Sequence, residues 1–214
     1  VSSMTQLDRS EWNALADHYE TPLLDWEWLH LLEDTGCVSP ETGWLPNHLV
    51  LKVEGRLAAA APMYVRTASA GEFVFDYAWA EVAEQLGVRY YPKLVAMSPL
   101  TPAVGYRFLI HPSLDQVQIT RMMSDAAGEF CRANRLGGMS ILWPDPDFAA
   151  ELDTELFTTW HHQHFRWENP GHQSFGDYVG EFTKNQRRNI RRERAAMERE
   201  GITMNHKKPR RLYG

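Results

Sequence analysis

Residues 160–201 read WHHQHFRWENPGHQSFGDYVGEFTKNQRRNIRRERAAMEREG. The stretch opens with aromatic and imidazole side chains, turns at Asn169-Pro170-Gly171 and then becomes helical. Ser174 followed by Asp177 has the pattern of a helix N-cap. At 100° per residue, apolar side chains fall on one stripe of the helical run. The opposite arc of this run is basic and contains Lys184, Arg188, Arg191 and Arg192, with Arg187 and Arg194 on its flank.

This basic arc has almost no compensating charge, since Glu193 is the one acidic residue within 184–194. Residues 184–214 hold 11 Lys and Arg and 3 Asp and Glu, a net charge of +8. Residues 1–183 hold 11 and 25, a net charge of −14. A self-repelling cationic helix in an acidic chain requires an anionic partner, either another surface of the fold or a phosphate-bearing ligand. A solvated helix surface is the alternative.

The whole chain has 214 residues, 43% hydrophobic and 23% charged, which is ordinary globular composition. Cys37 and Cys131 stand alone in the sequence, which favours a reducing compartment over a disulfide framework. No apolar run approaches the roughly 20 residues of a membrane-spanning helix, and no signal-peptide pattern is present. The sequence therefore predicts a soluble, cytoplasmic protein.

Strands alternate with helices along the chain, which predicts an α/β (α+β) fold with a mixed sheet flanked by helices. Residues 48–53 and 57–67 are expected to pair as a hairpin around Glu54-Gly55. A helix is expected from Ser113 to a stop at Gly137-Gly138. Asp147 is expected to cap a further helix reaching about residue 157, and residues 164–167 are expected to form a last strand.

Residues 90–107 differ from the rest, because Pro, Gly and hydroxyl residues surround two lone cations, Lys93 and Arg107. Pro99 and Pro102 exclude a helix and a central strand there. A stiffened segment with fixed cations is suited to line a cleft, because a pre-set backbone loses less entropy when a ligand binds. A plain surface loop is the alternative.

Two side chains are candidates for acid–base chemistry. Asp76 follows an apolar strand and precedes a helix, so it is either a helix N-cap or a group facing a cleft. In a cleft, partial burial would raise the pKa of Asp76 and suit it to hold or deprotonate an amine. His164 is expected to contact substrate or carry a proton. We expect no metal site, because the histidines at 161–164 alternate between the two faces of one strand.

Nucleophile elbows, dinucleotide fingerprints and phosphate loops are absent from the sequence. Six strings, in order, resemble the bacterial FemAB-like predicted N-acyltransferases, grouped with peptidoglycan biosynthesis or recognition. They are GWLPNHL (43–49), GEFVFDYAWA (71–80), YYPKL (90–94), SPLTPAVGYR (98–107), HFRWEN (164–169) and NQRRNIRRER (185–194). The resemblance runs from about residue 20 to residue 204.

The resemblance implies an acetyltransferase-like (GNAT) fold, one unit of a usually tandem architecture. It also implies amide-bond formation between an activated acyl or aminoacyl donor and an amine on a cell-wall precursor. We expect residues 1–172 to form the first acyltransferase unit and residues 173–201 a basic linking helix or helices. Residues 202–214 would begin a truncated second unit or form a disordered tail. An apolar surface left by a missing unit predicts self-association.

Within this hypothesis, Asp76 and His164 are the candidate catalytic residues. The expected substrate-binding residues are Lys93, Thr101, Gly105, Arg107, Trp167 and Asn169. The expected phosphate- or nucleic-acid-binding residues are Arg187, Arg188, Arg191 and Arg192.

The sequence leaves the acyl donor open and identifies no cofactor. The Gly-rich acetyl-CoA loop is not evident, although an acyl-CoA donor stays possible. An aminoacyl-tRNA would suit the four arginines, because cationic helices bind phosphate backbones without reading sequence. The alternative function is a non-catalytic module that binds a cell-wall precursor or nucleic acid such as tRNA.

Overall fold

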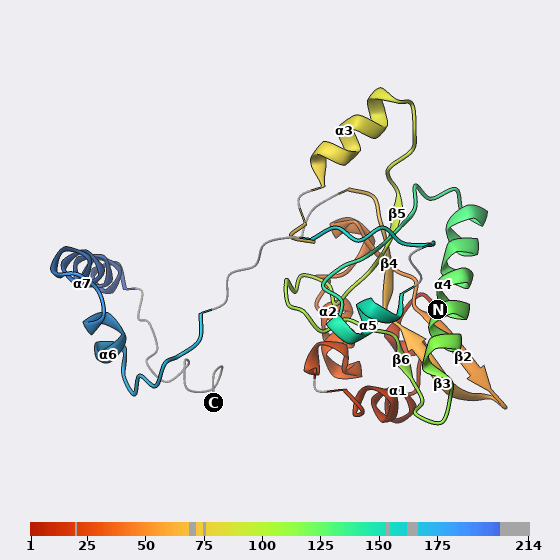
Figure 1. The fold of residues 1–214 in the computed structure, drawn as a ribbon, viewed down its shortest axis with the longest axis horizontal. Coiled ribbons are helices and arrows are strands. Elements are labelled where there is room, and N and C mark those ends of the chain that lie inside the picture. The colour runs from red at the N-terminus through yellow and green to blue at the C-terminus, as the bar shows by residue number, and fades with distance from the viewer. Residues whose placement is uncertain (20, 69–71, 75, 153–154, 162–166, 202–214) are drawn as a thin grey trace. The chain divides into compact units, whose positions relative to one another are not determined.

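The structure is a computed structural model. It describes the whole chain except residues 20, 69–71, 75, 153–154, 162–166 and 202–214. The chain forms two compact units, Val1–Thr159 and Trp160–Gly214, and each is described by itself (Figure 1). The domain boundaries expected from the sequence, with one at residue 172, stay a prediction.

Two sheets form the centre of the first unit. The first has the strand order β1-β4-β5-β7, with β5 and β7 parallel and the other pairs antiparallel. Its strands are β1 (Trp44–Pro46), β4 (Met63–Arg66), β5 (Lys93–Ala96) and β7 (Met139–Ile141). The second is antiparallel with the order β2-β3-β6. Its strands are β2 (Leu49–Val53), β3 (Arg56–Ala61) and β6 (Leu109–Ile110). The predicted mixed α/β architecture is confirmed.

The expected hairpin at Glu54-Gly55 is present and joins β2 to β3. Pro62 separates β3 from β4, so one segment of chain passes from the second sheet into the first. The segment that pairs with it, residues 44–53, also passes between the sheets, from β1 in the first to β2 in the second. At this crossing the N–H of Asn47 donates to the carbonyl of Met63 at 2.7 Å. Both sheets are therefore built on a single long hairpin.

Helices cover the sheets of this unit and close its core. Helix α1 (Arg9–Ala16) packs against β3 and β6, and α4 (Gln116–Ala133) packs against β7. Residues 59–61 of β3 are alanines with no exposed surface, and such small side chains let a helix approach the sheet closely. The fully buried Trp12 of α1 donates its indole N–H to the carbonyl of Leu24 at 2.8 Å, so its polar atom is satisfied inside the core.

The helix that follows β7 starts earlier and ends earlier than expected. Its N-cap is Asp145 rather than Asp147, and the Asp145 carboxylate accepts from the N–H groups of Asp147 and Phe148. Pro146 explains the shift, because proline is favoured in the first helical turn. The helix, α5 (Pro146–Glu151), stops six residues short of 157. Asp115 likewise caps α4 in place of Ser113.

The remaining helical elements of this unit are α2 (Trp26–Asp34), α3 (Tyr77–Gln85) and the 3₁₀ turns Met4–Gln6, Pro22–Leu24 and Pro40–Thr42. Helix α3 stands away from the sheets, and none of its residues is buried (Figure 1). One of its faces is apolar and open to solvent, with Trp79 55%, Val82 48% and the following Leu86 71% exposed.

The second unit contains α6 (Phe175–Gly180) and α7 (Lys184–Arg199). The predicted cap is confirmed, since Ser174 and Asp177 form a capping box. A second capping box, between Thr183 and Gln186, begins α7, so the helical run is divided into two helices. The strand expected at 164–167 falls almost wholly on residues outside the described part. No helix within the described residues has the length and apolar character needed to cross a membrane.

Candidate functional site

Four buried charged side chains meet where β4 ends and β5 begins. Arg66 and Lys93 are direct cross-strand neighbours, and Glu72 lies between them. Arg66 Nε donates to Glu72 Oε1 at 3.0 Å, and Lys93 Nζ lies 3.5 Å from Glu72 Oε2. Lys93 also forms an ion pair with Asp76. None of the four is more than 4% exposed, and their two positive and two negative charges balance, as buried charges require.

Asp76 immediately precedes α3, but its side chain makes no capping hydrogen bond. Its Oδ2 accepts a hydrogen bond from the hydroxyl of Tyr90 at 2.7 Å, and its Oδ1 accepts one from Tyr91 at 3.0 Å. The carboxylate therefore belongs to the buried network and not to the helix cap. Its catalytic role stays a prediction.

Tyr90 and Tyr91 form the edge of this network. Lys93 Nζ lies 5.1 Å and 5.3 Å from the centroids of the two rings, within the range of cation–π attraction. Burial, together with the hydrogen bond to Asp76, raises the pKa of Tyr90 well above its ordinary value. The Tyr90 phenol consequently remains protonated and donates its hydrogen bond throughout the neutral range.

Arg66 has further partners besides Glu72. Its guanidinium carbon lies 3.9 Å from the centroid of the Trp44 ring, and Nη1 donates to the carbonyls of Thr42 and Gly43. Sequence reasoning singled out neither Arg66 nor Glu72. A signal was available, because the strings at 71–80 and 90–94 supply Glu72, Asp76, both tyrosines and Lys93, and the fold brings the two strings together.

The segment between β5 and β6 holds three further predicted residues. The Thr101 hydroxyl donates to the carbonyl of Pro99 at 2.9 Å, which is a local turn contact. The N–H of Gly105 donates to the carbonyl of Trp143 at 3.0 Å. A side chain at Gly105 would bring a Cβ within 3.3 Å of the Thr21 hydroxyl, and Gly105 has a φ of +144°, so glycine is required there.

Arg107 has its own set of contacts. Its Nη1 lies 3.6 Å from Asp145 Oδ1, and its guanidinium carbon lies 4.2 Å from the centroid of Tyr19. The structure thus brings Asp76 and Lys93 together but engages Arg107 with other partners. The shared acceptor cleft expected for Lys93, Thr101, Gly105 and Arg107 stays a prediction.

In the second unit, Asn169 shapes a turn. Its Oδ1 accepts from the N–H of Gly171 at 3.2 Å and of His172 at 2.8 Å. Trp167 is 59% exposed, stacks near His172 with an interplanar angle of 10° and meets Tyr178 edge-on at 5.4 Å. The substrate contacts expected of Trp167 and Asn169 stay predictions. The candidate catalytic residue His164 lies outside the described residues.

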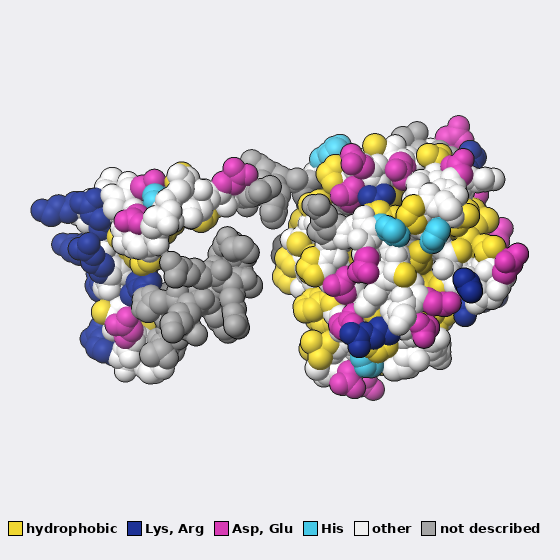
Figure 2. Space-filling view, turned by 90° about the horizontal axis from the view of Figure 1, so that it is seen from below, with side chains coloured by type: hydrophobic (Ala, Val, Ile, Leu, Met, Phe, Trp, Pro, Cys, Tyr) yellow, Lys and Arg dark blue, Asp and Glu magenta, His cyan; other side chains and the backbone are white. Residues whose placement is uncertain are grey.

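The four predicted phosphate-binding arginines differ in their surroundings. Arg187 Nη1 donates to the carbonyls of Gly180 and Phe182 at 3.2 Å and 2.7 Å, so this side chain closes the C-terminal end of α6. Arg188, Arg191 and Arg192 are exposed. Figure 2 shows Lys and Arg side chains gathered along one side of the second unit. Three arginines therefore form the accessible basic face, and Arg187 has a structural contact as well.

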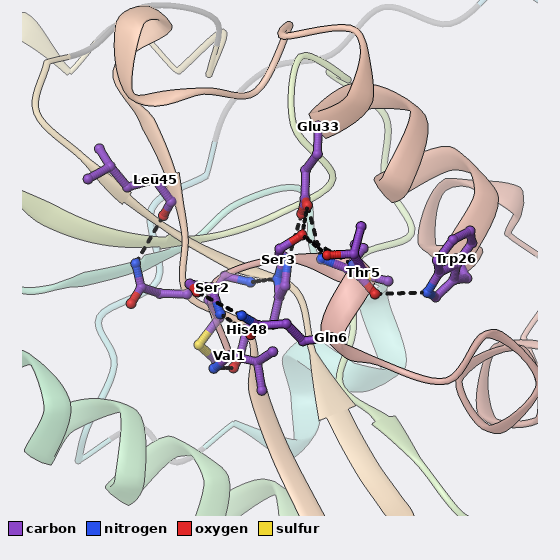
Figure 3. A network of polar contacts seen from close by, with 12 residues as sticks. Val1, Ser2, Ser3, Thr5, Gln6, Trp26, Glu33, Leu45 and His48 are labelled. Carbon is purple, nitrogen blue, oxygen red and sulfur yellow. Dashed lines mark hydrogen bonds and ion pairs between the residues drawn. The ribbon is translucent and has the colours of Figure 1, made fainter.

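A second polar cluster, which is partly buried and which sequence reasoning missed, surrounds the buried His48 (Figure 3). His48 Nε2 lies 3.0 Å from Glu33 Oε1, while its Nδ1 accepts from the N–H of Met63 at 3.3 Å. Glu33 Oε2 accepts from Ser3 Oγ and from the N–H of Met4. Burial lowers the pKa of His48, and the hydrogen bond that His48 donates to the Glu33 carboxylate opposes this shift only in part.

A hollow of about 500 Å³ opens between α3 and the segment that leads into β5. It is lined by Tyr77, Ala80, Glu81, Glu84, Val88, Arg89, Tyr90 and Tyr91. The tyrosines that bind Asp76 therefore have the buried network on one side and this hollow on the other. Among the described residues, no group of three or more His, Cys, Asp or Glu is placed to hold a metal ion.

The fold and these contacts define an α/β protein with a neutralised charged network at the junction of two central strands. The chain belongs to the FemAB-like family, described as peptidoglycan biosynthesis/recognition, whose model matches residues 3–212. The resemblance found in the sequence is thereby confirmed.

Two solved structures match this chain with low sequence identity and low TM-scores. A ribosomal-protein-alanine N-acetyltransferase from Brucella melitensis biovar Abortus 2308 is 14% identical, with a TM-score of 0.45; the match covers 77% of this chain and 96% of that one. An aminoglycoside N-acetyltransferase, AAC(6')-Iy, in complex with CoA, is 10% identical, with a TM-score of 0.41 and coverage of 76% and 92%. A search of curated proteins found no match.

Proposed function

We propose that this chain is an N-acyltransferase that joins an activated acyl or aminoacyl group to an amine, with a peptidoglycan precursor as the acceptor. The observation that carries the proposal is the family match over residues 3–212. In the reaction, the neutral amine nitrogen attacks the acyl carbonyl, an amide bond forms, the bond to the leaving group breaks, and the amine loses a proton.

The buried network supports this proposal by fixing the geometry beside the hollow. Asp76 accepts hydrogen bonds from Tyr90 and Tyr91 and neutralises Lys93, so the two phenols are held at defined positions. In this proposal Asp76 and His164 are the candidates that receive the proton of the amine. Lys93 would act chiefly by holding the Asp76 carboxylate, because its side chain is 5% exposed and already has two acidic partners.

The donor in this proposal is an aminoacyl-tRNA, with acyl-CoA as the second candidate. The exposed Arg188, Arg191 and Arg192 support the tRNA donor, because a phosphate backbone is the kind of ligand that a cationic helix face attracts. Binding that weakens steeply as the salt concentration rises is the expected signature.

The test is transfer of a labelled acyl group. The purified chain is incubated with labelled aminoacyl-tRNA or acyl-CoA and a peptidoglycan precursor that carries a free amine. Amide product is expected with one donor and is expected to fall at least about 100-fold in Asp76→Asn. Asp125→Asn, an exposed position on α4, is the matched control and should retain activity.

The alternative is a binding module without catalysis. One observation in its favour is that both oxygens of Asp76 already have partners within the protein: Tyr90, Tyr91 and Lys93. The family description also includes recognition. Precursor binding with no transfer from either donor would select this alternative. Transfer that is lost in a folded Asp76→Asn variant would reject it.

A further inference from the structure

The hollow beside α3 has one wall made by a single helical face. Tyr77, Ala80, Glu81 and Glu84 have the spacing i, i+3, i+4 and i+7, and this places them on one side of the helix. The exposed apolar side chains of α3, Trp79 and Val82, lie on another side of the helix. Helix α3 therefore presents its aromatic and acidic side to the hollow.

The opposite wall of the hollow is fixed to the body of the unit. The N–H of Gly137 donates to the carbonyl of Pro92 at 2.7 Å. The backbone of residues 89 and 90 passes so close to Gly137 that no side chain fits there. The hydroxyls of Tyr90 and Tyr91 are anchored on Asp76. This wall is consequently pre-organised, which lowers the entropic cost of binding a ligand.

The charges that line the hollow favour a cation. Glu81 and Glu84 are exposed, and neither forms an ion pair within the part of the chain that the structure describes. The one lining cation, Arg89, has its Nη1 directed to the carbonyl of Arg135 at 2.9 Å. Two carboxylates next to tyrosine rings are the surroundings that attract an ammonium group, through charge and through cation–π contact.

The volume of the hollow sets the size of the ligand. About 500 Å³ lies within the range of small-molecule sites and is ample for a short aliphatic chain that carries an ammonium group. Apolar contact with the Tyr77 ring and Val88 would accommodate the methylene groups of such a chain.

We propose that the hollow between α3 and residues 88–91 binds an alkylammonium ligand, with Glu81 and Glu84 receiving the charge and the tyrosine rings packing against the chain. The inference concerns binding alone and stands whether or not the protein transfers an acyl group. It gives α3, whose residues are all at least partly exposed, a role as one wall of a binding site.

The test uses 1,5-diaminopentane as the probe and 1,5-pentanediol as an uncharged molecule of the same length. The full chain, labelled with ¹⁵N, is titrated with each probe while amide chemical shifts are followed. The diamine is expected to shift the amides of residues 77–91 in a saturable manner. The diol is expected to bind at least about fivefold more weakly, because it lacks the charge.

The double variant Glu81→Gln with Glu84→Gln removes both charges at nearly constant shape, and it should weaken diamine binding at least about fivefold. The control is Asp125→Asn with Glu129→Gln, which changes the net charge equally on exposed positions of α4. The control should bind as the unmodified chain does. Shifts that map to other residues, equal binding of the diol, or equal weakening in the control would each overturn the proposal.

Discussion

Gly137 lies directly against the backbone of Tyr90. A Cβ added at Gly137 would sit 2.2 Å from the Tyr90 carbonyl oxygen and 2.6 Å from that of Arg89. Real Cβ atoms do not approach backbone oxygens so closely, so the segment that enters β5 can pass here only because residue 137 has no side chain. The glycine expected to act as a helix stop is thus also a packing position, four residues beyond the end of α4.

Gly137→Ala should therefore lower the free energy of unfolding by about 1–3 kcal/mol, since backbone must move to relieve the clash. Urea denaturation measures the loss. Gly128→Ala is the matched control: its Cβ would meet Arg132 Nη1 at 3.6 Å, an ordinary contact, within helix α4. That substitution should raise stability by about 0.5–1 kcal/mol. Equal stability of the two variants would contradict the packing role of Gly137.

Lys93→Met should destabilise the first unit by about 3 kcal/mol, because it leaves the buried carboxylates of Asp76 and Glu72 with too little positive charge. Adding Asp76→Asn should recover part of this loss, because the second substitution removes one uncompensated charge. Urea denaturation of the single and double variants measures the coupling. Strictly additive losses would show that Lys93 and Asp76 do not depend on each other.

The His48 cluster predicts a stability that falls on acidification. Because burial lowers the pKa of His48, the unfolded chain takes up a proton near pH 6.5 while the folded chain does not. Stability is then lost as the pH falls below about 6.5, with a slope of at most about 1.4 kcal/mol per pH unit.

Glu33 acts in the same direction at lower pH. Burial alone would raise the pKa of Glu33, but hydrogen bonds from His48, Met4 and Ser3 together lower it. Its contribution is present above about pH 4.3 and is lost as the pH falls through the folded pKa.

Melting temperatures between pH 5 and pH 7 isolate the His48 effect. The slope should flatten in His48→Gln and persist in His18→Gln, an exposed control. A pH slope that is unchanged in His48→Gln would refute the assignment.

Arg187 and Arg188 are neighbours in sequence but are predicted to behave differently. Arg187→Ala removes two hydrogen bonds to the end of α6 and should lower the helix content of the second unit, at a cost of about 1 kcal/mol. Arg188→Ala should leave folding unchanged but reduce the salt dependence of tRNA binding by about one unit of slope. Circular dichroism and filter binding at several salt concentrations separate the two effects, and identical behaviour of both variants would contradict the distinction.

Local chemistry was the part of the fold that the sequence could predict. The hairpin at Glu54-Gly55 and the capping box at Ser174 depend on residues near one another in the chain, and both are present. The cap at Asp145 was missed because two aspartates lie two residues apart and Pro146 decides between them. The spacing of Thr183 and Gln186 is that of a capping box and indicates the start of α7. The apolar periodicity, which continues across this point, instead suggested one uninterrupted helix.

The candidate site could be predicted only in part, because its contacts join distant segments. Asp76 and Lys93 were singled out separately, yet nothing local to either residue shows that they form an ion pair. Glu72 and Arg66 resemble ordinary surface charges in the sequence and become recognisable only when β4 and β5 pair. The close approach of Gly137 to the backbone of Tyr90 could not be predicted either, because 46 residues separate the two in the sequence.

The passage of one hairpin through both sheets at Pro62 has a mechanical consequence. Because both sheets contain strands of the same hairpin, one sheet cannot unfold while the other stays intact. We therefore expect the two sheets to unfold together, as one cooperative unit. Amide protons of Ala60 and Tyr64, on either side of the proline, should then exchange with solvent at the same opening free energy. The link through Pro62 would thus couple the unfolding of the two sheets.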